Sequence, residues 1–422
     1  MQQQTDSDVL IVGAGPAGLS LAISLAQAGL RATVVEQQSA ASLAHPAPDG
    51  REIALTHPSA DTLRRLGSWA ALAPDEIGRI HGAQVHDGPV GQHAALALDA
   101  SGSGREALGW IVPNHALRRS AWAVASQLPG VRLITGAQVQ RVAITPGHAA
   151  LDYADTDGAT RTLQAPLLVA ADSRFSATRR QLGIGAAMQD FGRTVIVCRM
   201  RHAQPGDGVA HECFGYERTL AVLPLPPATD GTPLCSVVVT AGTADASALM
   251  ALPAQAFAAQ VQAQFQQRLG AMALEGERHA YPLVAVYARH FSGHRCALLG
   301  DAAVGMHPVT AHGYNLGLSG VERLTRALVE ARRAGRDIGD AAVLAAYSRD
   351  PHRHAWPIYQ GTNTVVRLFT DARPLPRLLR QAVLQGARRL PPLKAAIVAQ
   401  LTGRTPGQPA WRPVLPMQPP AP

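Results

Sequence analysis

The sequence predicts an α/β fold in which a Rossmann-like domain is interleaved with a smaller, mainly antiparallel β-sheet domain and is followed by C-terminal helices. Three observations support this prediction. Residues 8–36 have the pattern of a βαβ unit, residues 185–285 contain short β-rich runs separated by Pro, Gly and Asp, and a long helical region covers 314–347. The chain has 422 residues, of which 47% are apolar, so it is large enough to bury the cores of two lobes.

The N-terminal unit is DVLIVGAGPAGLSLAISLAQAGLRATVVE, residues 8–36. Its first apolar run predicts a strand, the following glycines a turn and the next segment an amphipathic helix that Gly29 ends before a second strand. Gly13, Gly15 and Gly18 form G-x-G-x-x-G between the first strand and the helix, which is the context that a dinucleotide site requires.

Each glycine of this turn has a physical role in such a site. Gly13 permits the tight turn, Gly15 lets a pyrophosphate approach the backbone, and Gly18 lets the helix pack closely on the strand. Glu36 ends the second strand, 23 residues after Gly13, where a carboxylate can accept hydrogen bonds from a ribose. The alternative is a plain glycine-rich turn with a surface glutamate, and the unit alone does not distinguish FAD from NAD. The candidate ligands of this unit are Gly13, Gly15, Pro16, Ala17, Gly18, Glu36 and Gln37.

Further apolar runs complete the two predicted domains. RLIT near 132, PLLVAA near 166 and CALLG near 296 have the length of buried strands, whereas TVIVCRM, TLAVLPL and LCSVVVT are typical of an antiparallel sheet. An Ala/Gln-rich helix is expected at 253–270. The predicted boundaries are 1–70, 107–184 and 286–372 for the first domain, 71–106 and 185–285 for the second, and 373–422 for a basic helical segment with a disordered tail.

A second candidate nucleotide contact lies in CALLGDAAVGMHPVTAHGYNLGL, residues 296–318. Asp301, after Gly300, is placed to accept a hydrogen bond from a ribityl hydroxyl, which favours FAD. Gly313, Tyr314 and Asn315 would open a helix whose N–H groups face the flavin N1 and C2 carbonyl. The alternative is an ordinary strand-to-helix loop capped by Asp or Asn.

The charge distribution argues against a nucleic-acid partner. The formal net charge is +8, but no acidic residue follows Asp371 and eight basic residues do, so the rest of the chain is close to neutral. The basic segment from 373 onward either contacts an anionic membrane surface or a protein of a biosynthetic complex, or it is a solvated helical cap.

Targeting and metal-binding patterns are also missing from the sequence. The four cysteines are scattered singly, without a C-x-x-C pair or a histidine at ligand spacing, so no metal site is predicted. The polar N-terminus does not resemble a signal peptide, and no apolar run approaches the roughly 20 residues that cross a bilayer. We expect a cytoplasmic protein whose membrane contact, if any, is peripheral and at the inner face.

Four stretches together resemble the FAD-dependent aromatic hydroxylases of the para-hydroxybenzoate hydroxylase fold, and within them the ubiquinone-biosynthesis hydroxylases (UbiH/UbiF/VisC). These are the N-terminal unit, DGREIALTHPSADTLRRLGSW at 49–69, VAADSRFSATRRQLGI at 169–184, and YPL at 281 with the 300–318 segment. The form V-T-A-H-G-Y-N in the last stretch is most similar to the UbiM subgroup.

The resemblance implies further cofactor contacts. Arg51 matches an arginine that reaches the FAD pyrophosphate and isoalloxazine side, and Asn114 matches a polar FAD contact, with Arg118 one turn later. Asp172 belongs to a segment similar to A-D-G-x-x-S-x-x-R, which touches FAD. The alternative for each of these four residues is a structural role, as a solvated loop charge, a helix cap or a surface side chain.

The sequence departs from the family pattern in three places. Ser173 replaces a glycine and adds a side chain where relatives bring the backbone close to a pyridine nucleotide. Val304 replaces a histidine, and Ala311-His312 replaces glycine-glutamine before Gly313. His307 and His312 are then the titratable groups expected near the flavin ring, either as catalytic groups or as structural histidines. Pro308 is expected to position the substrate ring.

The activity that the resemblance implies is hydroxylation of the ring of a prenylated phenol or quinol intermediate of ubiquinone biosynthesis, such as demethoxyubiquinol. FAD would act through a C4a-hydroperoxyflavin, with NAD(P)H as external reductant and O2 as co-substrate. Strands near 219–225 and 234–240 would supply an apolar wall for this lipophilic substrate, with Tyr216, Leu223 and Val238 as candidates that could equally be core residues. The alternatives are hydroxylation of another phenolic compound and a non-catalytic FAD-binding subunit of a biosynthetic complex.

Overall fold

A parallel β-sheet forms the centre of the first lobe. The computed structural model describes residues 7–88, 90–91, 95–101, 104–215, 217–306, 312–348, 355–356, 359–361, 364 and 398–399. The sheet has the strand order β18-β19-β12-β1-β2-β8, in which only the edge strand β18 is antiparallel. The expected βαβ unit and the strands near 132, 166 and 296 are thereby confirmed. The strands are β1 (Val9–Val12), β2 (Ala32–Glu36), β8 (Val131–Thr135), β12 (Leu167–Ala170), β18 (Ser292–Gly293) and β19 (Cys296–Leu298).

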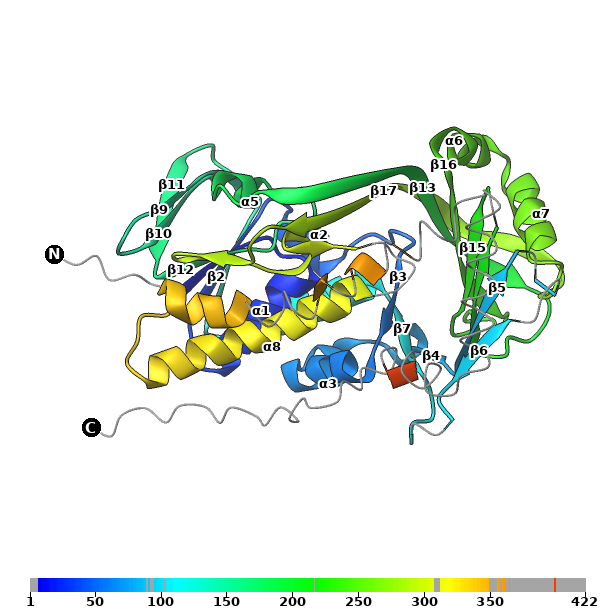
Figure 1. The fold of residues 1–422 in the computed structure, drawn as a ribbon, viewed down its shortest axis with the longest axis horizontal. Helices are drawn as coiled ribbons and strands as arrows, with labels where there is room; N and C mark the ends of the chain where they lie inside the picture. Colours follow the sequence, from blue (N-terminus) through cyan, green and yellow to red (C-terminus); the bar gives the residue numbers. More distant parts are fainter. Residues whose placement is uncertain are drawn as a thin grey trace.

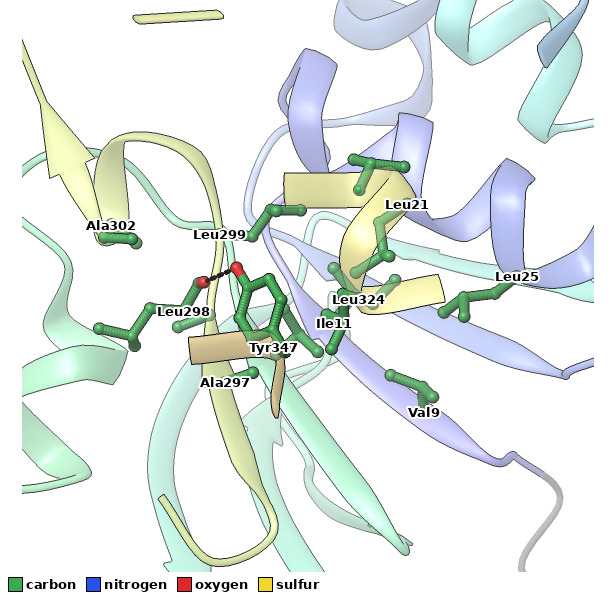
Figure 2. Close-up of a cluster of buried hydrophobic side chains, with 14 of the residues drawn as sticks. Val9, Ile11, Leu21, Leu25, Ala297, Leu298, Leu299, Ala302, Leu324 and Tyr347 are labelled. Atoms are coloured by element: carbon green, nitrogen blue, oxygen red, sulfur yellow. Dashed lines mark hydrogen bonds between the residues drawn. The ribbon is translucent and has the colours of Figure 1, made fainter. Parts of the chain in front are cut away.

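Helices cover one face of this sheet and a three-stranded meander covers the other (Figure 1). On the helical side, α1 (Pro16–Gln27) packs beside α8 (His312–Arg333), and the Thr325 hydroxyl donates to Ser24 Oγ at 2.9 Å. On the other side lie β9 (Gln138–Ile144), β10 (Ala149–Ala154) and β11 (Thr160–Ala165). Figure 2 shows the helical-side core, where Tyr347 also donates its hydroxyl to the Leu298 carbonyl at 2.8 Å.

The second lobe is an eight-stranded, mainly antiparallel sheet with the order β20-β17-β13-β16-β15-β14-β5-β6. Only β14 and β5 are parallel. Helices α6 (Thr243–Ala251) and α7 (Ala254–Gln264) pack on one face through an apolar cluster that includes Phe257. The strands are β5 (Gly82–Asp87), β6 (Leu96–Asp99), β13 (Ala186–His202), β14 (Val209–Phe214), β15 (Thr219–Pro224), β16 (Leu234–Gly242), β17 (Met272–Ala288) and β20 (Val304–Gly305).

Two long strands connect the lobes. β13 and β17 have 17 residues each and run from the parallel-sheet lobe into the second lobe, as Figure 1 shows. A small sheet, β3-β7-β4, lies between the two larger sheets. Its strands are β3 (Glu52–Leu55), β4 (Gly78–Ile80) and β7 (Gly109–Pro113). Four further helices are α2 (Ala40–Ala44), α3 (His57–Leu66), α4 (Asn114–Ala125) and α5 (Ala177–Gln181).

The helical region expected over 314–347 is two helices. α8 ends at Arg333 because Gly335 takes a left-handed conformation, φ 65°, and the Arg336 amide donates back to the Ala331 carbonyl at 2.9 Å. A second helix follows at 341–348. None of the helices in the described ranges is both long and apolar enough to span a bilayer. Apart from residues 398–399, the basic segment at 373–422 lies outside the described residues.

Candidate active site

The glycine turn between β1 and α1 is tightly packed at two positions and open at the third. Gly13 has φ 105°, and a Cβ there would lie 2.6 Å from the Ala171 carbonyl oxygen. A Cβ on Gly18 would overlap the carbonyl oxygen of Gly13. A Cβ on Gly15, by contrast, meets no atom of the described residues within 4 Å. Gly15 therefore faces open space at the N-terminus of α1, which is where a pyrophosphate would approach the backbone.

Glu36 is fixed beside this turn by two backbone donors. Its Oε2 accepts from the Ala14 amide at 2.7 Å and its Oε1 from the Gln38 amide at 2.9 Å. Parallel pairing of β1 with β2 brings these residues to the same edge of the sheet. Gln37 is exposed, and Arg118 of α4 donates to the Gln38 side chain at 2.7 Å.

The early and late candidate loops meet at three small residues. Gly300, φ 60°, lies two residues after the end of the buried strand β19, and a Cβ there would lie 3.1 Å from Ala17 Cβ in α1. A Cβ on Gly317 of α8 would lie 3.6 Å from the same Ala17 atom. The structure thus brings together two segments that are almost three hundred residues apart in the sequence.

Arg174 and Arg179 hold the loop that carries Asp301. Arg174 donates from Nη2 to Asp301 Oδ2 at 3.2 Å and from Nη1 to the Val284 carbonyl at 2.7 Å. The buried Arg179 donates to the Ala302 carbonyl at 2.8 Å. Sequence reasoning assigned no role to Arg174, because nothing local separates it from the other arginines of this arginine-rich chain.

Arg51 lies in a cluster of polar groups that ends near the same loop. Its guanidinium pairs with Asp49 and lies 5.4 Å from the centre of the Tyr281 ring, while Asn114 donates to Asp49 Oδ2 at 2.7 Å. Burial lowers the pKa of Arg51, but the hydrogen bond and charge of Asp49, with smaller effects of Tyr281 and Asp301, raise it overall. The charges of Arg51 and Asp301 therefore act within one site, and Asp49 and Tyr281 are members that sequence reasoning missed.

The first turn of α8 is fastened to the start of α3. Asn315 Oδ1 accepts from the Thr56 amide at 3.0 Å, and its amide group donates to the Ala54 carbonyl at 2.9 Å. The Tyr314 hydroxyl lies 3.4 Å from Ser20 Oγ, and burial raises its pKa to about 12. Gly313 is near the candidate carboxylate, since a Cβ there would lie 3.8 Å from Asp301 Oδ1.

Asp172 uses both carboxylate oxygens at the start of the short helix α5. It accepts from the Ser176 hydroxyl and, at 3.0 Å, from the Thr178 amide, while Ser176 accepts from the Arg179 amide at 2.8 Å. In this structure the carboxylate thus satisfies otherwise unpaired donors at a helix N-terminus.

Ser173 has φ 89°, a conformation that glycine adopts freely and other residues do not. We expect Ser173→Gly to raise the free energy of unfolding by about 0.5–1 kcal/mol, because the relieved strain of about 1–2 kcal/mol exceeds the added chain entropy. Denaturant unfolding of the variant measures this. Ser126→Gly is the matched control, since Ser126 has φ −67° at the end of α4 and its replacement should destabilise. Equal effects of the two changes would contradict the strain at Ser173.

A buried ion pair joins the small sheet to the second lobe. Arg199 of β13 donates to Glu52 Oε1 at 2.8 Å; the Glu52 side chain is 2% exposed and its Oε2 has no partner among the described residues. Burial raises the pKa of Glu52 to about 7 although Arg199 opposes the shift.

The raised pKa of Glu52 predicts a pH-dependent stability. Between pH 4.5 and about 7 the folded state binds a proton that the unfolded state releases, so stability falls as pH rises through this window, by up to about 3 kcal/mol. Glu52→Gln should remove this slope in denaturant titrations at pH 5 and pH 7.5. Glu106→Gln, at a side chain that is 89% exposed, should leave it unchanged. An unaltered slope in Glu52→Gln would contradict the shift.

Four predicted positions have no described side chain. His307 and Pro308 lie outside the described residues, as does Tyr216, and His312 is placed only as the first residue of α8. Val304, at the position of the expected histidine, is a buried residue of β20. The described residues contain no group of three or more His, Cys, Asp or Glu side chains that could hold a metal ion.

The described groups fit a dinucleotide cofactor. Gly15 leaves room for a pyrophosphate at a helix N-terminus, and the Arg51 guanidinium adds a cation. The carboxylates of Glu36 and Asp301 are acceptors for hydroxyls at two ends of the same site. Such an arrangement can bind an extended molecule with a phosphate centre and hydroxylated arms.

Comparison with known proteins agrees with this geometry. Residues 6–362 match the family described as FAD binding domain. The chain is 44% identical to the ubiquinone hydroxylase UbiM of Neisseria meningitidis over 94% of this chain and 85% of that protein. It is 33% identical to the ubiquinone hydroxylase UbiL of Rhodospirillum rubrum, over 94% and 90%. The crystal structure of p-nitrophenol 4-monooxygenase PnpA from Pseudomonas putida shares the fold, with a TM-score of 0.76 and 19% identity over 96% of this chain and all of that one.

The family match covers most of the chain, and the relatives align along nearly its whole length. The family match and the relatives agree with the predicted fold class and with the resemblance to the aromatic hydroxylases that the sequence motifs indicate. The chain therefore belongs to the FAD-binding family of flavoprotein aromatic hydroxylases, in the branch that contains the ubiquinone hydroxylases.

Proposed function

We propose that this protein is an FAD-dependent monooxygenase that hydroxylates the ring of a prenylated phenol or quinol in ubiquinone biosynthesis, such as demethoxyubiquinol. The observation that carries the proposal is the 44% identity, over 94% of this chain, to a protein named as a ubiquinone hydroxylase. The junction of Ala17, Gly300 and Gly317 supports the cofactor part, because the early and late candidate loops lie close together there.

The proposed binding roles follow the chemistry of each group. The turn at Gly15 and the guanidinium of Arg51 suit the pyrophosphate, Glu36 suits the ribose, and Asp301 suits the ribityl chain. The start of α8 suits the flavin ring, where negative charge collects on reduction. The further proposed contacts are Gly13, Pro16, Ala17, Gly18, Gln37, Asn114, Arg118, Asp172, Gly300, Pro308, Gly313, Tyr314 and Asn315.

Bound FAD would supply the oxygen chemistry, with NAD(P)H as reductant and O2 as co-substrate. The chain's own task is to bind the cofactor, orient the substrate ring and exclude water. We propose Pro308, His307 and His312 as the residues beside the reacting ring. The partly accessible Leu223 and Val238 would form part of an apolar wall, which suits a lipophilic substrate.

We also propose the division into an FAD-binding domain (1–70, 107–184, 286–372) and a substrate domain (71–106, 185–285). For the basic segment from 373 onward we propose contact with the inner face of the membrane or with other proteins of the pathway, because its clustered arginines suit an anionic surface. Sedimentation with anionic and neutral vesicles, before and after removal of residues 373–422, tests the membrane contact.

The activity is tested with the purified, FAD-loaded protein, NADH or NADPH, O2 and a short-chain demethoxyubiquinol. A product heavier by one oxygen atom, formed with matching O2 consumption, supports the proposal. Turnover only on unrelated phenols favours the second candidate, a hydroxylase of another phenolic compound. Bound FAD without turnover under any reductant favours a non-catalytic subunit.

The biological substrate is tested by quinone analysis of a deletion strain. Accumulation of a deoxy or demethoxy intermediate is expected. Unchanged ubiquinone without such an intermediate would contradict the quinol assignment.

A further inference from the structure

One face of the second-lobe sheet carries a carboxyl group that has no partner among the described residues. On β14, His211 and Cys213 point toward α7: the His211 ring lies 5.2 Å from the ring of Phe265, and Cys213 belongs to the apolar cluster under the helices. Side chains alternate along a strand, so Ala210 and Glu212 point to the opposite face. Ala210 packs there against the cluster that contains Ile111 of the small sheet. Glu212 thus faces the side of the sheet that is turned toward the parallel-sheet lobe.

Strand register places Glu212 in an otherwise apolar row. Val197 pairs with Val238, Val238 with Ala221, Ala221 with Glu212, and Glu212 with Val85. Val238, Glu212 and Val85 are each partly accessible although β16, β14 and β5 are internal strands. The described residues therefore do not cover this row completely.

The row begins beside the candidate cofactor site. A Cβ on Gly50 would lie 3.0 Å from Val197 Cγ2, and the next residue is Arg51. Three strand spacings separate Val197 from Glu212, which amounts to about 14 Å. A substituted aromatic ring with the start of a side chain can lie along such a row.

Glu212 differs from Glu275 and Asp245 of the same lobe in having no cation among the described residues. Glu275 pairs with Arg201, and Asp245 pairs with Arg218. Glu212 has no hydrogen bond or ion pair within the described part of the chain, and the surrounding protein raises its pKa to about 8 by desolvation alone. A carboxyl group that is desolvated without a hydrogen-bond partner destabilises the folded protein. A hydrogen bond with a ligand hydroxyl would offset this free-energy cost.

We propose that Glu212 binds the ring hydroxyl of the aromatic substrate, orients the ring along the row from Val197 to Val85, and selects phenols over their ethers. This inference rests on the proposed function. A carboxyl accepts from a hydroxyl when ionised and can also donate when protonated, whereas the valine and alanine neighbours offer only apolar contact. Glu212 is thus a positioning and specificity residue for the proposed reaction.

The test uses a probe that does not reduce the flavin. Binding of 2-methoxy-5-methylphenol and of its methyl ether to the oxidised, FAD-loaded protein is followed by the change in flavin absorbance. At a pH above about 8, where Glu212 is ionised, a hydrogen bond to the charged group contributes about 1.5–3 kcal/mol, so the wild type should prefer the phenol by about 10- to 100-fold. Glu212→Ala should lose this preference. Glu212→Gln, which keeps the shape but not the charge, should retain a smaller preference.

Glu217→Ala is the matched control, because Glu217 is exposed on the turn that follows the same strand. It should bind both probes like the wild type. A wild type without preference, a preference retained in Glu212→Ala, or an equal loss in Glu217→Ala would overturn the inference. If Glu212→Ala does not retain FAD, the isosteric Glu212→Gln variant provides the test instead. It should prefer the phenol less than the wild type does.

The binding measurement does not require turnover, so the two proposals fail separately. If the protein discriminates through Glu212 but hydroxylates no quinol, only the proposed function falls. If it hydroxylates quinols while Glu212→Ala keeps full discrimination, only the assignment of Glu212 falls.

Discussion

Replacing Gly15 by alanine is expected to give a folded protein that no longer retains FAD. An added Cβ meets nothing within 4 Å in the part of the chain that the structure describes, so the chain should fold with nearly unchanged stability. The same methyl group would occupy the space where the pyrophosphate approaches the helix N-terminus. We expect affinity for FAD to fall at least about 100-fold, equivalent to about 2.7 kcal/mol. The ratio of flavin to protein absorbance and a titration of apoprotein with FAD measure the loss.

Gly18→Ala is the contrasting control from the same turn. Its Cβ would overlap the Gly13 carbonyl oxygen, so α1 would have to move away from β1. This change should destabilise the fold itself by about 3 kcal/mol or more. Circular dichroism and thermal unfolding separate the two outcomes. If Gly15→Ala binds FAD normally, or if it unfolds like Gly18→Ala, the open space at Gly15 is not the pyrophosphate site.

Asp301→Ala is expected to weaken FAD binding by about 10- to 100-fold, because charge-assisted hydrogen bonds to one carboxylate contribute about 1.5–3 kcal/mol. Asp301 is 39% exposed in the side chain and lies beside Arg174, which keeps its bond to the Val284 carbonyl when the carboxylate is removed. The loop should therefore remain folded. FAD titration of the apoprotein, with far-UV circular dichroism as the folding measurement, tests this expectation.

The matched control for Asp301 is Asp61→Ala. Asp61 is 47% exposed and pairs with Arg64 on the surface of α3, so its loss should leave the flavin content unchanged. Normal FAD affinity in Asp301→Ala would remove the late loop from the cofactor site, while the N-terminal turn would keep its assignment.

The sequence predicted those parts of the site that local patterns encode. The turn at Gly13–Gly18 and the loop at Gly300 combine apolar strands with glycines, and such patterns depend on neighbours in the chain. The two lobes were also predictable, since β-rich runs of the second lobe differ in texture from the βαβ unit. The site residues themselves stay predictions until the variants above are measured.

Contacts between distant segments could not be read from the sequence. Glu52 meets Arg199 across 147 positions, and Arg174 meets Asp301 across 127, through strand register and loop packing. The position of Glu212 opposite Ala221 likewise depends on pairing between strands. A single arginine or glutamate in a chain rich in charged loops has no local signal that names its partner.

The paired strands β13 and β17 have a mechanical consequence. They hydrogen-bond to each other from Ala186–Ala288 to His202–Met272, with irregularities only between Asp190 and Thr194 and between Val197 and Arg199. The continuous pairing on both sides of these irregularities limits bending, so relative motion of the lobes is expected to be small and confined to the two irregular positions. Entry of a bulky lipophilic molecule would then depend on local rearrangement of short segments and not on a large movement of one lobe relative to the other.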